Sequence, residues 1–344
     1  MRKGNKKVVL GMSGGIDSSV AAALLKGAGF DVIGIFMNLY DSSNFKQSEK
    51  RAKKIAAMLG IDFLSIDLRK EFDKKIIQPF IKEHRQGRTP NPCIVCNKEI
   101  KFDVLFKKMK ELKADFIATG HYVRIKNQRL LRAKDKSKDQ SYFLWQLAPK
   151  LLSKTLFPLA GYTKKETFKL AKDFNLPLEN ISDSQEICFV QSNLINFLKD
   201  YLKQNPGKIL DSNNNIIGEH KGLWAYTIGQ RKGIGFSGGP YYVVKKDINK
   251  NTLIVSKNEK ELYRKELIAK DINWIMKDKP KFPLKIKAMI RYRSNLCSAV
   301  VDRYKGNKIK VIFLKPQRAI TAGQSIVFYD GQELLGGGII NHYE

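Results

Sequence analysis

The chain has 344 residues, 43% of them hydrophobic, which is enough to build the cores of two or three globular domains. Its 63 Lys and Arg residues outnumber 33 Asp and Glu residues and give a formal net charge of +30, so we expect a polyanionic partner and favour nucleic acid over a general lysine bias. Four cysteines do not make a secreted disulfide framework, and no apolar run has the length of a signal peptide or a transmembrane helix. These features argue against secreted and membrane classes and predict a protein of the reducing cytoplasm.

Strands and helices are predicted to alternate through the first 200 residues. A buried strand over 8–12 is followed by a helix near 18–25, and the pattern then repeats: strand 31–37, helix 48–58, strand 62–67, helix 71–84, helix 98–112 and strand 115–118. Two further helices are expected, one opened by the capping-box residues Thr163 and Glu166 and one over 193–202. Repeated βα units predict a doubly wound α/β domain with a parallel sheet, which we assign to residues 1–204.

The second half has a different character. Beyond residue 204 the sequence is rich in Gly and Asn, with short alternating runs that predict β structure. A softer break near 260–271 divides it into a central mainly-β module, 205–264, and a C-terminal module, 265–344. Strand spacing in the last module predicts a small β-barrel, with strands at 285–291, 297–302, 308–313 and 325–329.

A glycine-rich turn lies between the first strand and the first helix. Its string Ser13-Gly14-Gly15-Ile16-Asp17-Ser18 has the layout of a phosphate cradle, with backbone N–H groups turned inward at the positive end of a helix. It lacks the Gly-Lys-Ser/Thr of a Walker A loop and the third glycine of a dinucleotide fingerprint. It resembles the PP-loop of the ATP pyrophosphatases, which adenylate a carbonyl-type oxygen and release pyrophosphate, and an ordinary Gly/Ser turn is the alternative.

Three of the cysteines lie in two polar stretches. Cys93 and Cys96 follow a Gly- and Pro-rich run, so we expect them on a loop before a helix that starts near Lys98, where the pKa of a thiol can be lowered. A single Cys-x-x-Cys alone is equally typical of a metal site, a redox pair or two ordinary thiols. Cys188 follows the polar run 181–186 and alone would more often be a core thiol, as we expect of Cys297.

Taken together, these stretches resemble the tRNA-specific 2-thiouridylases, which replace O2 of the wobble uridine of tRNA by sulfur. The resemblance runs nearly end to end. It takes in further segments at 120–122, 138–144, 226–233 and 291–293. For this family it implies an ATP site formed by Gly11, Met12, Ser13, Gly14, Gly15, Ile16, Asp17 and Ser18, with Met37 and Gly120 near the sugar and adenine. Asp17 would contribute to magnesium binding or, alternatively, cap the helix.

The resemblance also assigns roles to the cysteines. Cys188 matches the residue that carries sulfur as a persulfide, supplied by a cysteine desulfurase or a sulfur-relay protein. Cys96 matches the second catalytic cysteine, whose attack on Cys188 releases the thiolated base and leaves a disulfide. Cys93 occupies a position where the family often has Asp, which puts a proton-handling role there in doubt. Three thiols could instead hold a [4Fe-4S] cluster with one open iron, and zinc is less favoured because no histidine lies near either cysteine stretch.

The resemblance further implies contacts with tRNA. The target base would meet Asn91, Pro92 and Cys93, and the anticodon arm would meet Lys138, Asp139, Gln140, Arg291 and Tyr292.

Two other functions remain open from the residues themselves. One is a sulfur-free PP-loop ligase, and the other is a nonenzymatic RNA-binding protein with a relic nucleotide loop.

Overall fold

The computed structural model describes residues 5–177, 187–190, 193–234, 239–276, 278 and 280–343. Its N-terminal half is built on a parallel sheet with the strand order β3-β2-β1-β4-β7. The central strand carries Val8, Val9 and Leu10, all without solvent exposure, because helices cover both faces of the sheet. The predicted doubly wound α/β domain is confirmed. The strands are β1 (Lys7–Gly11), β2 (Asp31–Asn38), β3 (Asp62–Asp67), β4 (Phe116–Ala118) and β7 (Thr155–Leu156).

Helices pack on the two faces through separate hydrophobic clusters. Helices α1, α2 and α8 contribute to the cluster that contains Val8 and Leu10, whereas α6 contributes to the cluster that contains Val9. The capping box of Thr163 and Glu166 opens α8 as predicted. The bounds are α1 (Ile16–Gly27), α2 (Ser43–Leu59), α6 (Asp103–Glu111), α7 (Pro149–Leu152), α8 (Lys164–Asp173) and α9 (Leu194–Lys199).

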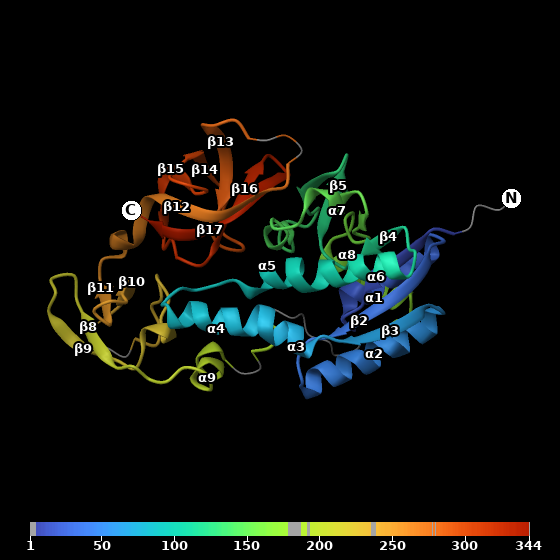
Figure 1. Ribbon diagram of the computed structural model, residues 1–344, viewed down its shortest axis with the longest axis horizontal. Coiled ribbons are helices and arrows are strands. Elements are labelled where there is room, and N and C mark those ends of the chain that lie inside the picture. Colours follow the sequence, from blue (N-terminus) through green and yellow to red (C-terminus); the bar gives the residue numbers. More distant parts are fainter. Residues whose placement is uncertain are drawn as a thin grey trace.

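Two long helices, each with a π-helical segment, run side by side away from the sheet (Figure 1). One consists of α3 (Arg69–Phe72), Asp73–Ile77 and α4 (Gln78–Arg85), and the other of α5 (Pro92–Cys96), Asn97–Phe102 and α6. The prediction of a loop around the Cys-x-x-Cys was therefore wrong. Pro92 occupies the first helical turn, where its missing N–H costs nothing, and the side chain of Asn91 caps the helix by accepting from Cys93 N at 3.2 Å.

A small mixed sheet follows, with the strand order β10-β11-β8-β9. Figure 1 shows it beyond the ends of α4 and α5 that point away from the parallel sheet. Its strands are β8 (Gly207–Leu210), β9 (Ile216–His220), β10 (Tyr242–Asp247) and β11 (Thr252–Ser256). The expected mainly-β character of this segment is confirmed.

The C-terminal strands form a closed barrel, as predicted. The order β12-β15-β14-β13-β16-β17 closes through pairing of β12 with β17. Much of the expected soft break at 260–271 is in fact the long strand β12, and the hairpin β5–β6, which the sequence analysis missed, joins the barrel sheet through Leu131 and Glu333. The strands are β5 (Val123–Lys126), β6 (Arg129–Arg132), β12 (Tyr263–Trp274), β13 (Leu284–Met289), β14 (Cys297–Arg303), β15 (Ile309–Arg318), β16 (Ser325–Asp330) and β17 (Glu333–Tyr343). Among the described helices, none has the length and apolar character needed to span a membrane.

Candidate active site

The glycine-rich turn lies at the carboxyl end of β1 and leads into α1. Ser13 N donates to Ser18 Oγ at 3.1 Å, and the carbonyl of Gly14 accepts from Arg51 Nε at 3.2 Å. Gly14 has φ of +73°, and a Cβ there would lie 2.1 Å from the carbonyl oxygen of Ser48, so only glycine fits. The N-cap residue Gly15 offers no side-chain cap to the first N–H groups of α1. Such a helix start is suited to an anion.

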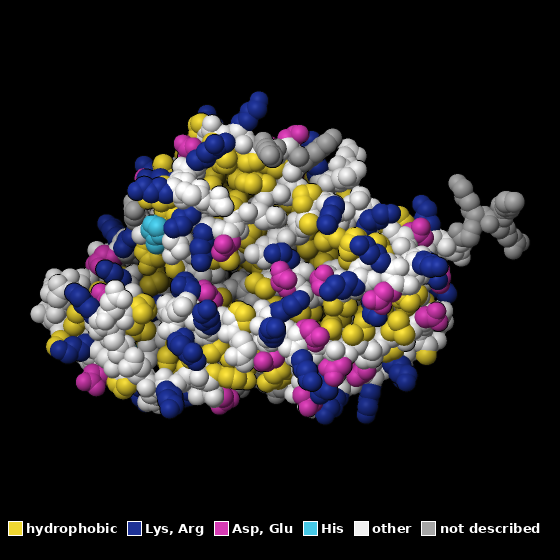
Figure 2. All heavy atoms as spheres, in the orientation of Figure 1, with side chains coloured by type: hydrophobic (Ala, Val, Ile, Leu, Met, Phe, Trp, Pro, Cys, Tyr) yellow, Lys and Arg dark blue, Asp and Glu magenta, His cyan; other side chains and the backbone are white. Residues whose placement is uncertain are grey.

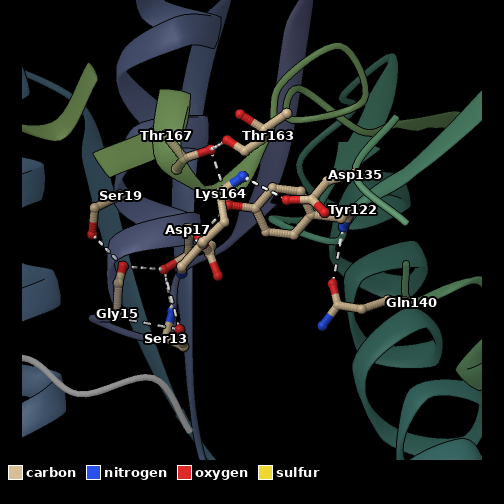
Figure 3. A network of polar contacts seen from close by, with 11 residues as sticks. Ser13, Gly15, Asp17, Ser19, Tyr122, Asp135, Gln140, Thr163, Lys164 and Thr167 are labelled. Atoms are coloured by element: carbon tan, nitrogen blue, oxygen red, sulfur yellow. Dashed lines mark hydrogen bonds and ion pairs between the residues drawn. The ribbon is translucent and has the colours of Figure 1, made fainter. Parts of the chain in front are cut away.

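Asp17 lies in the first turn of α1, beyond the cap position, so it is not the N-cap residue. Its Oδ1 atom accepts from Lys164 Nζ at 2.8 Å and from the hydroxyl of Tyr122 at 2.7 Å (Figure 3). The same hydroxyl lies 2.9 Å from Oγ1 of Thr167. Asp17 therefore links the start of α1 to α8 and to the segment after β4.

The segment after β4 presses on the glycine-rich turn. A Cβ on Gly120 would lie 2.9 Å from the carbonyl carbon of Asp17 and 2.9 Å from the backbone nitrogen of Ser18. Met37, near the end of β2, packs partly buried between the hydrophobic clusters that contain Val9 and Cys96. Both residues expected near ATP thus lie at the carboxyl edge of the sheet, which is where ligands bind in open α/β folds.

The second part of the site holds three thiols. Cys96 is 5% exposed and belongs to the hydrophobic cluster that contains Phe189 and Val190, the two residues that follow Cys188. Cys93 and Cys96 are near enough to Cys188 for their charges to act on it, Cys93 also acts on Cys96, and all three act on Lys101. The structure therefore brings the two cysteine stretches together around one lysine.

Burial, and not a position near the start of a helix, determines the direction in which the pKa of these thiols shifts. Desolvation raises the pKa of Cys96 to about 11 and that of Cys188 to about 12, although the Cys188 side chain keeps contact with solvent. It also raises the pKa of Cys93. The expectation of a lowered pKa for Cys93 and Cys96 was therefore wrong, because neighbouring protein atoms desolvate both thiols. Lys101 opposes the shift in all three, and no described residue forms a hydrogen bond or an ion pair with its ammonium.

His121 connects the two parts of the site. It lies between Gly120, which rests on the turn, and Tyr122, which holds Asp17. Burial lowers the pKa of His121 to about 3, with Lys101 acting in the same direction, so its imidazole is neutral at pH 7. Its Nδ1 atom lies 2.8 Å from Oγ1 of Thr119. Gly120 and Tyr122 thus contact the phosphate turn, and His121 between them lies near enough to Lys101 for that lysine's charge to act on it, as it acts on the three thiols.

The described residues bring no three His, Cys, Asp or Glu side chains into an arrangement that could hold a metal ion. A cluster on Cys93, Cys96 and Cys188 would therefore need these side chains to rearrange. Cys297 lies apart in β14, where its thiol donates to the carbonyl of Asn295 at 3.6 Å.

The residues expected to contact tRNA gather around a cleft of about 530 Å³ between the α/β domain and the barrel. Lys138, Asp139 and Tyr292 line it, together with Arg132, Lys136, Ser137, Tyr142, Met289, Arg293, Ser294 and Asn295. Arg291 precedes Tyr292 in the chain, and its Nη2 atom donates to Oγ1 of Thr321 at 3.3 Å. Lys and Arg side chains are also spread over the visible face of the molecule (Figure 2).

Asp139 and Gln140, both expected to contact tRNA, form hydrogen bonds within the protein. Asp139 is buried, and its carboxylate accepts from Arg132 Nε at 2.7 Å and from two backbone N–H groups. Gln140 accepts from the backbone N–H of Tyr122 at 2.9 Å (Figure 3). Both side chains fix the segment that carries Lys138, and their direct contact with tRNA stays a prediction.

The sequence analysis assigned no role to Lys164, Lys101 or Arg51, although all three lie at the site. The only local feature that marks Lys164 is its position directly after the cap residue of α8. Its partner Asp17 is 147 residues away in the chain, so the sequence does not show that the two residues pair. The contacts of Asn91, Pro92 and Cys93 with the target base can form only when tRNA is bound, so they stay predictions.

An α/β sheet that carries this turn at the carboxyl end of its central strand, followed by two β modules, defines a PP-loop nucleotide-binding protein. Family models match residues 6–192 as a tRNA methyl transferase HUP domain, 195–257 as a tRNA methyl transferase PRC-barrel domain and 264–340 as an aminomethyltransferase beta-barrel domain. The chain belongs to the family of the tRNA-specific 2-thiouridylase MnmA.

Relatives match over nearly the full length. The tRNA-specific 2-thiouridylase MnmA of Halothermothrix orenii is 46% identical, covering 97% of this chain and 98% of that protein. The MnmA of Clostridioides difficile is 43% identical, with 98% of each chain covered. Among solved structures, the U34-tRNA thiolase NcsA from Methanococcus maripaludis with its [4Fe-4S] cluster is 23% identical over 54% of this chain and 61% of that chain, with a TM-score of 0.38.

Proposed function

We propose that this protein thiolates the wobble uridine of tRNA at C2 in an ATP-dependent reaction, with Cys188 as the sulfur carrier and Cys96 as the second catalytic cysteine. The observation that carries this proposal is the segment Gly120–Tyr122. It contacts the phosphate turn through Gly120 and Tyr122, and Lys101, whose charge acts on His121, also acts on the three thiols. An activated oxygen and a sulfur nucleophile can therefore meet at one uracil ring.

The first step activates the base. Uracil O2 is a poor leaving group, so it attacks the α-phosphorus of ATP, pyrophosphate leaves, and O2 becomes part of an adenylate. The turn over residues 11–18 holds the phosphates through backbone N–H groups and the start of α1. A magnesium ion bound with ATP would draw on Asp17, and it supplies charge neutralisation of the phosphates.

The second step transfers sulfur. The terminal sulfur of a Cys188 persulfide attacks C2, the bond from C2 to the adenylated oxygen breaks, and AMP leaves. Cys96 then attacks the Sγ atom of Cys188, which breaks the bond between the two sulfurs and releases the 2-thiouridine. A Cys96–Cys188 disulfide remains, and an external dithiol reduces it with two electrons. Lys101 favours the thiolate forms that these attacks need.

The tRNA would lie across the domains. A wobble base in a single-stranded loop is cheap to extrude, and we place it against Asn91, Pro92 and Cys93. The cleft with Lys138 and Tyr292 would hold the backbone of the anticodon arm through charge and stacking. In this proposal residues 1–204 catalyse the reaction, and the modules 205–264 and 265–344 grip the tRNA.

A second route uses the same residues differently. Because the charges of Cys93, Cys96 and Cys188 all act on Lys101, the three thiols could ligate a [4Fe-4S] cluster after rearrangement, and an open iron would then carry sulfide. Iron and acid-labile sulfide analysis of anaerobically purified protein distinguishes the routes. Stoichiometric iron and sulfide that disappear in Cys93→Ser would favour the cluster, and their absence would favour the persulfide.

The test of the proposed function is mass spectrometry of nucleosides from unmodified tRNA. The tRNA is incubated with the protein, ATP, magnesium and a cysteine desulfurase. We expect 2-thiouridine that depends on ATP, is lost in Cys188→Ser and in Cys96→Ser, and is retained in the matched control Cys297→Ser, whose cysteine lies apart in β14. No thiolated base from folded, tRNA-bound protein would contradict the proposal and favour a sulfur-free ligase or a binding protein.

A further inference from the structure

The carboxylate of Asp17 is held by one of its two oxygens. Both the ammonium of Lys164 and the hydroxyl of Tyr122 donate to Oδ1, at 2.8 and 2.7 Å. Among the residues that the structure describes, none donates a hydrogen bond to Oδ2 or pairs with it. Figure 3 shows Lys164 and Tyr122 beside Asp17. This fixes the orientation of Asp17 and leaves Oδ2 without a donor among the described residues.

The pair is buried at one end and open at the other. The side chain of Lys164 is 10% exposed, whereas that of Asp17 is 34% exposed. Charged hydrogen bonds of this kind are strong when one member is desolvated. The more exposed member, Asp17, lies in the first turn of α1, directly after the turn expected to bind phosphates.

Lys164 is itself held rigidly. It is the first residue of α8, its backbone N–H donates to a carboxylate oxygen of Asp135 at 3.0 Å, and Thr163 caps the helix. Its ammonium lies 5.0 Å from the ring centre of Phe168 and 6.0 Å from that of Tyr122. The lysine is therefore a fixed positive charge beside the phosphate turn, directed at Asp17.

A triphosphate and a carboxylate in the same turn repel each other unless a cation compensates one of them. In the free protein Lys164 compensates Asp17. Magnesium is usually bound in proteins by one or two carboxylates together with substrate phosphates and water. One oriented carboxylate with one available oxygen fits that requirement.

We propose that Lys164, assisted by Tyr122, is a positioning residue of the ATP site: it neutralises Asp17 through Oδ1 and presents Oδ2 to the magnesium ion that accompanies ATP. The inference rests on the ATP binding that the proposed function requires. Lys164 acts through Asp17 and does not touch the nucleotide.

The experiment is a double-mutant cycle on ATP affinity, measured by calorimetry with saturating magnesium and again with a chelator. The variants are Lys164→Met, Asp17→Asn, the double variant and Tyr122→Phe, with thermal unfolding recorded for each. Lys165→Met is the matched control, because it removes the same charge from an exposed position in the same turn of α8.

We expect Lys164→Met to raise the Kd for metal-free ATP about tenfold, because the Asp17 carboxylate is left uncompensated. In the Asp17→Asn background the same change alters the Kd less than about twofold. Asp17→Asn alone abolishes the gain in affinity that magnesium gives and does not weaken metal-free binding. Tyr122→Phe weakens binding of magnesium-ATP roughly threefold, since one hydrogen bond to Oδ1 is lost. Lys165→Met leaves every value unchanged.

Equal losses from Lys164→Met with and without Asp17 would overturn the inference, because Lys164 would then act on the nucleotide directly or through the fold alone. So would unchanged ATP affinity in Lys164→Met and Tyr122→Phe while the wild-type protein binds ATP. Failure of the wild-type protein to bind ATP would overturn the proposed function, and this inference with it.

Discussion

Replacing Gly120 by Ala should weaken ATP binding without unfolding the protein. The added Cβ would lie 2.9 Å from both the carbonyl carbon of Asp17 and the backbone nitrogen of Ser18, and 3.0 Å from the Asp17 carbonyl oxygen. All three are backbone atoms at the start of α1. No side-chain rotation relieves the contact, so the segment after β4 and the phosphate turn must separate.

The magnitude follows from the cost of overpacking. Forcing a methyl group into a packed site costs about 1–3 kcal/mol. If the strain falls on the nucleotide-bound conformation, the Kd for ATP rises about 5- to 150-fold, since about 1.4 kcal/mol corresponds to tenfold. The matched control is Gly27→Ala, at the other end of α1, where an added Cβ meets nothing within 4 Å.

Calorimetric titration with ATP and magnesium tests this, with thermal unfolding as the measure of folding. Gly120→Ala should lose affinity while it unfolds cooperatively, and Gly27→Ala should keep the wild-type Kd. A wild-type Kd in Gly120→Ala would refute the contact between this segment and the turn. An equal loss in both variants would show that the effect is not local.

Three other results are expected. Thr163→Ala removes the capping box of α8 and should lower the free energy of unfolding by about 1 kcal/mol, visible as a lower urea midpoint at unchanged slope. Burial, aided by the charge of Lys246, lowers the pKa of His84 from 6.5 to about 4, so the unfolded chain binds a proton that the folded protein does not. The free energy of unfolding should therefore fall by up to about 3 kcal/mol as the pH drops from 6.5 to 4, and urea titrations of His84→Gln should show a correspondingly smaller fall. Asp139→Ala leaves the partly buried Arg132 guanidinium without its carboxylate partner and should destabilise the protein by roughly 3 kcal/mol, whereas Lys138→Ala should weaken tRNA binding in a filter assay with unchanged thermal stability. Equal stability of these last two variants would contradict the structural role of Asp139.

Local signals predicted much of the fold. The apolar run of β1, the glycines of the turn and the cap at Thr163 each determine backbone geometry within a few residues, and the structure has all of them. The barrel strands were predicted from short runs in which apolar and polar residues alternate. This pattern arises when one face of a strand is buried and the other is exposed. The hairpin β5–β6 was missed because its two four-residue strands pair with a sheet that is completed 200 residues later.

The chemistry of the site was harder to predict because it depends on distant neighbours. Pro and Gly before Cys93 suggested a loop, yet a proline is compatible with the first helical turn, and with the cap from Asn91 the helix begins at Pro92. The thiols were expected to have a lowered pKa, and the packing of Phe189 and Val190 against Cys96 reverses the direction. Lys164 and Asp17 are far apart in the chain, so no local pattern could pair them.

The central claim is that Cys96 and Cys188 act as a pair in sulfur transfer. The most direct measurement is a single turnover without reductant: persulfide-charged protein is mixed with ATP, magnesium and unmodified tRNA and quenched by alkylation, and peptide and nucleoside mass spectrometry follow. We predict that the Cys96–Cys188 disulfide and 2-thiouridine form in equal amounts. Thiolated tRNA that accumulates while both cysteines remain open to alkylation would contradict the account.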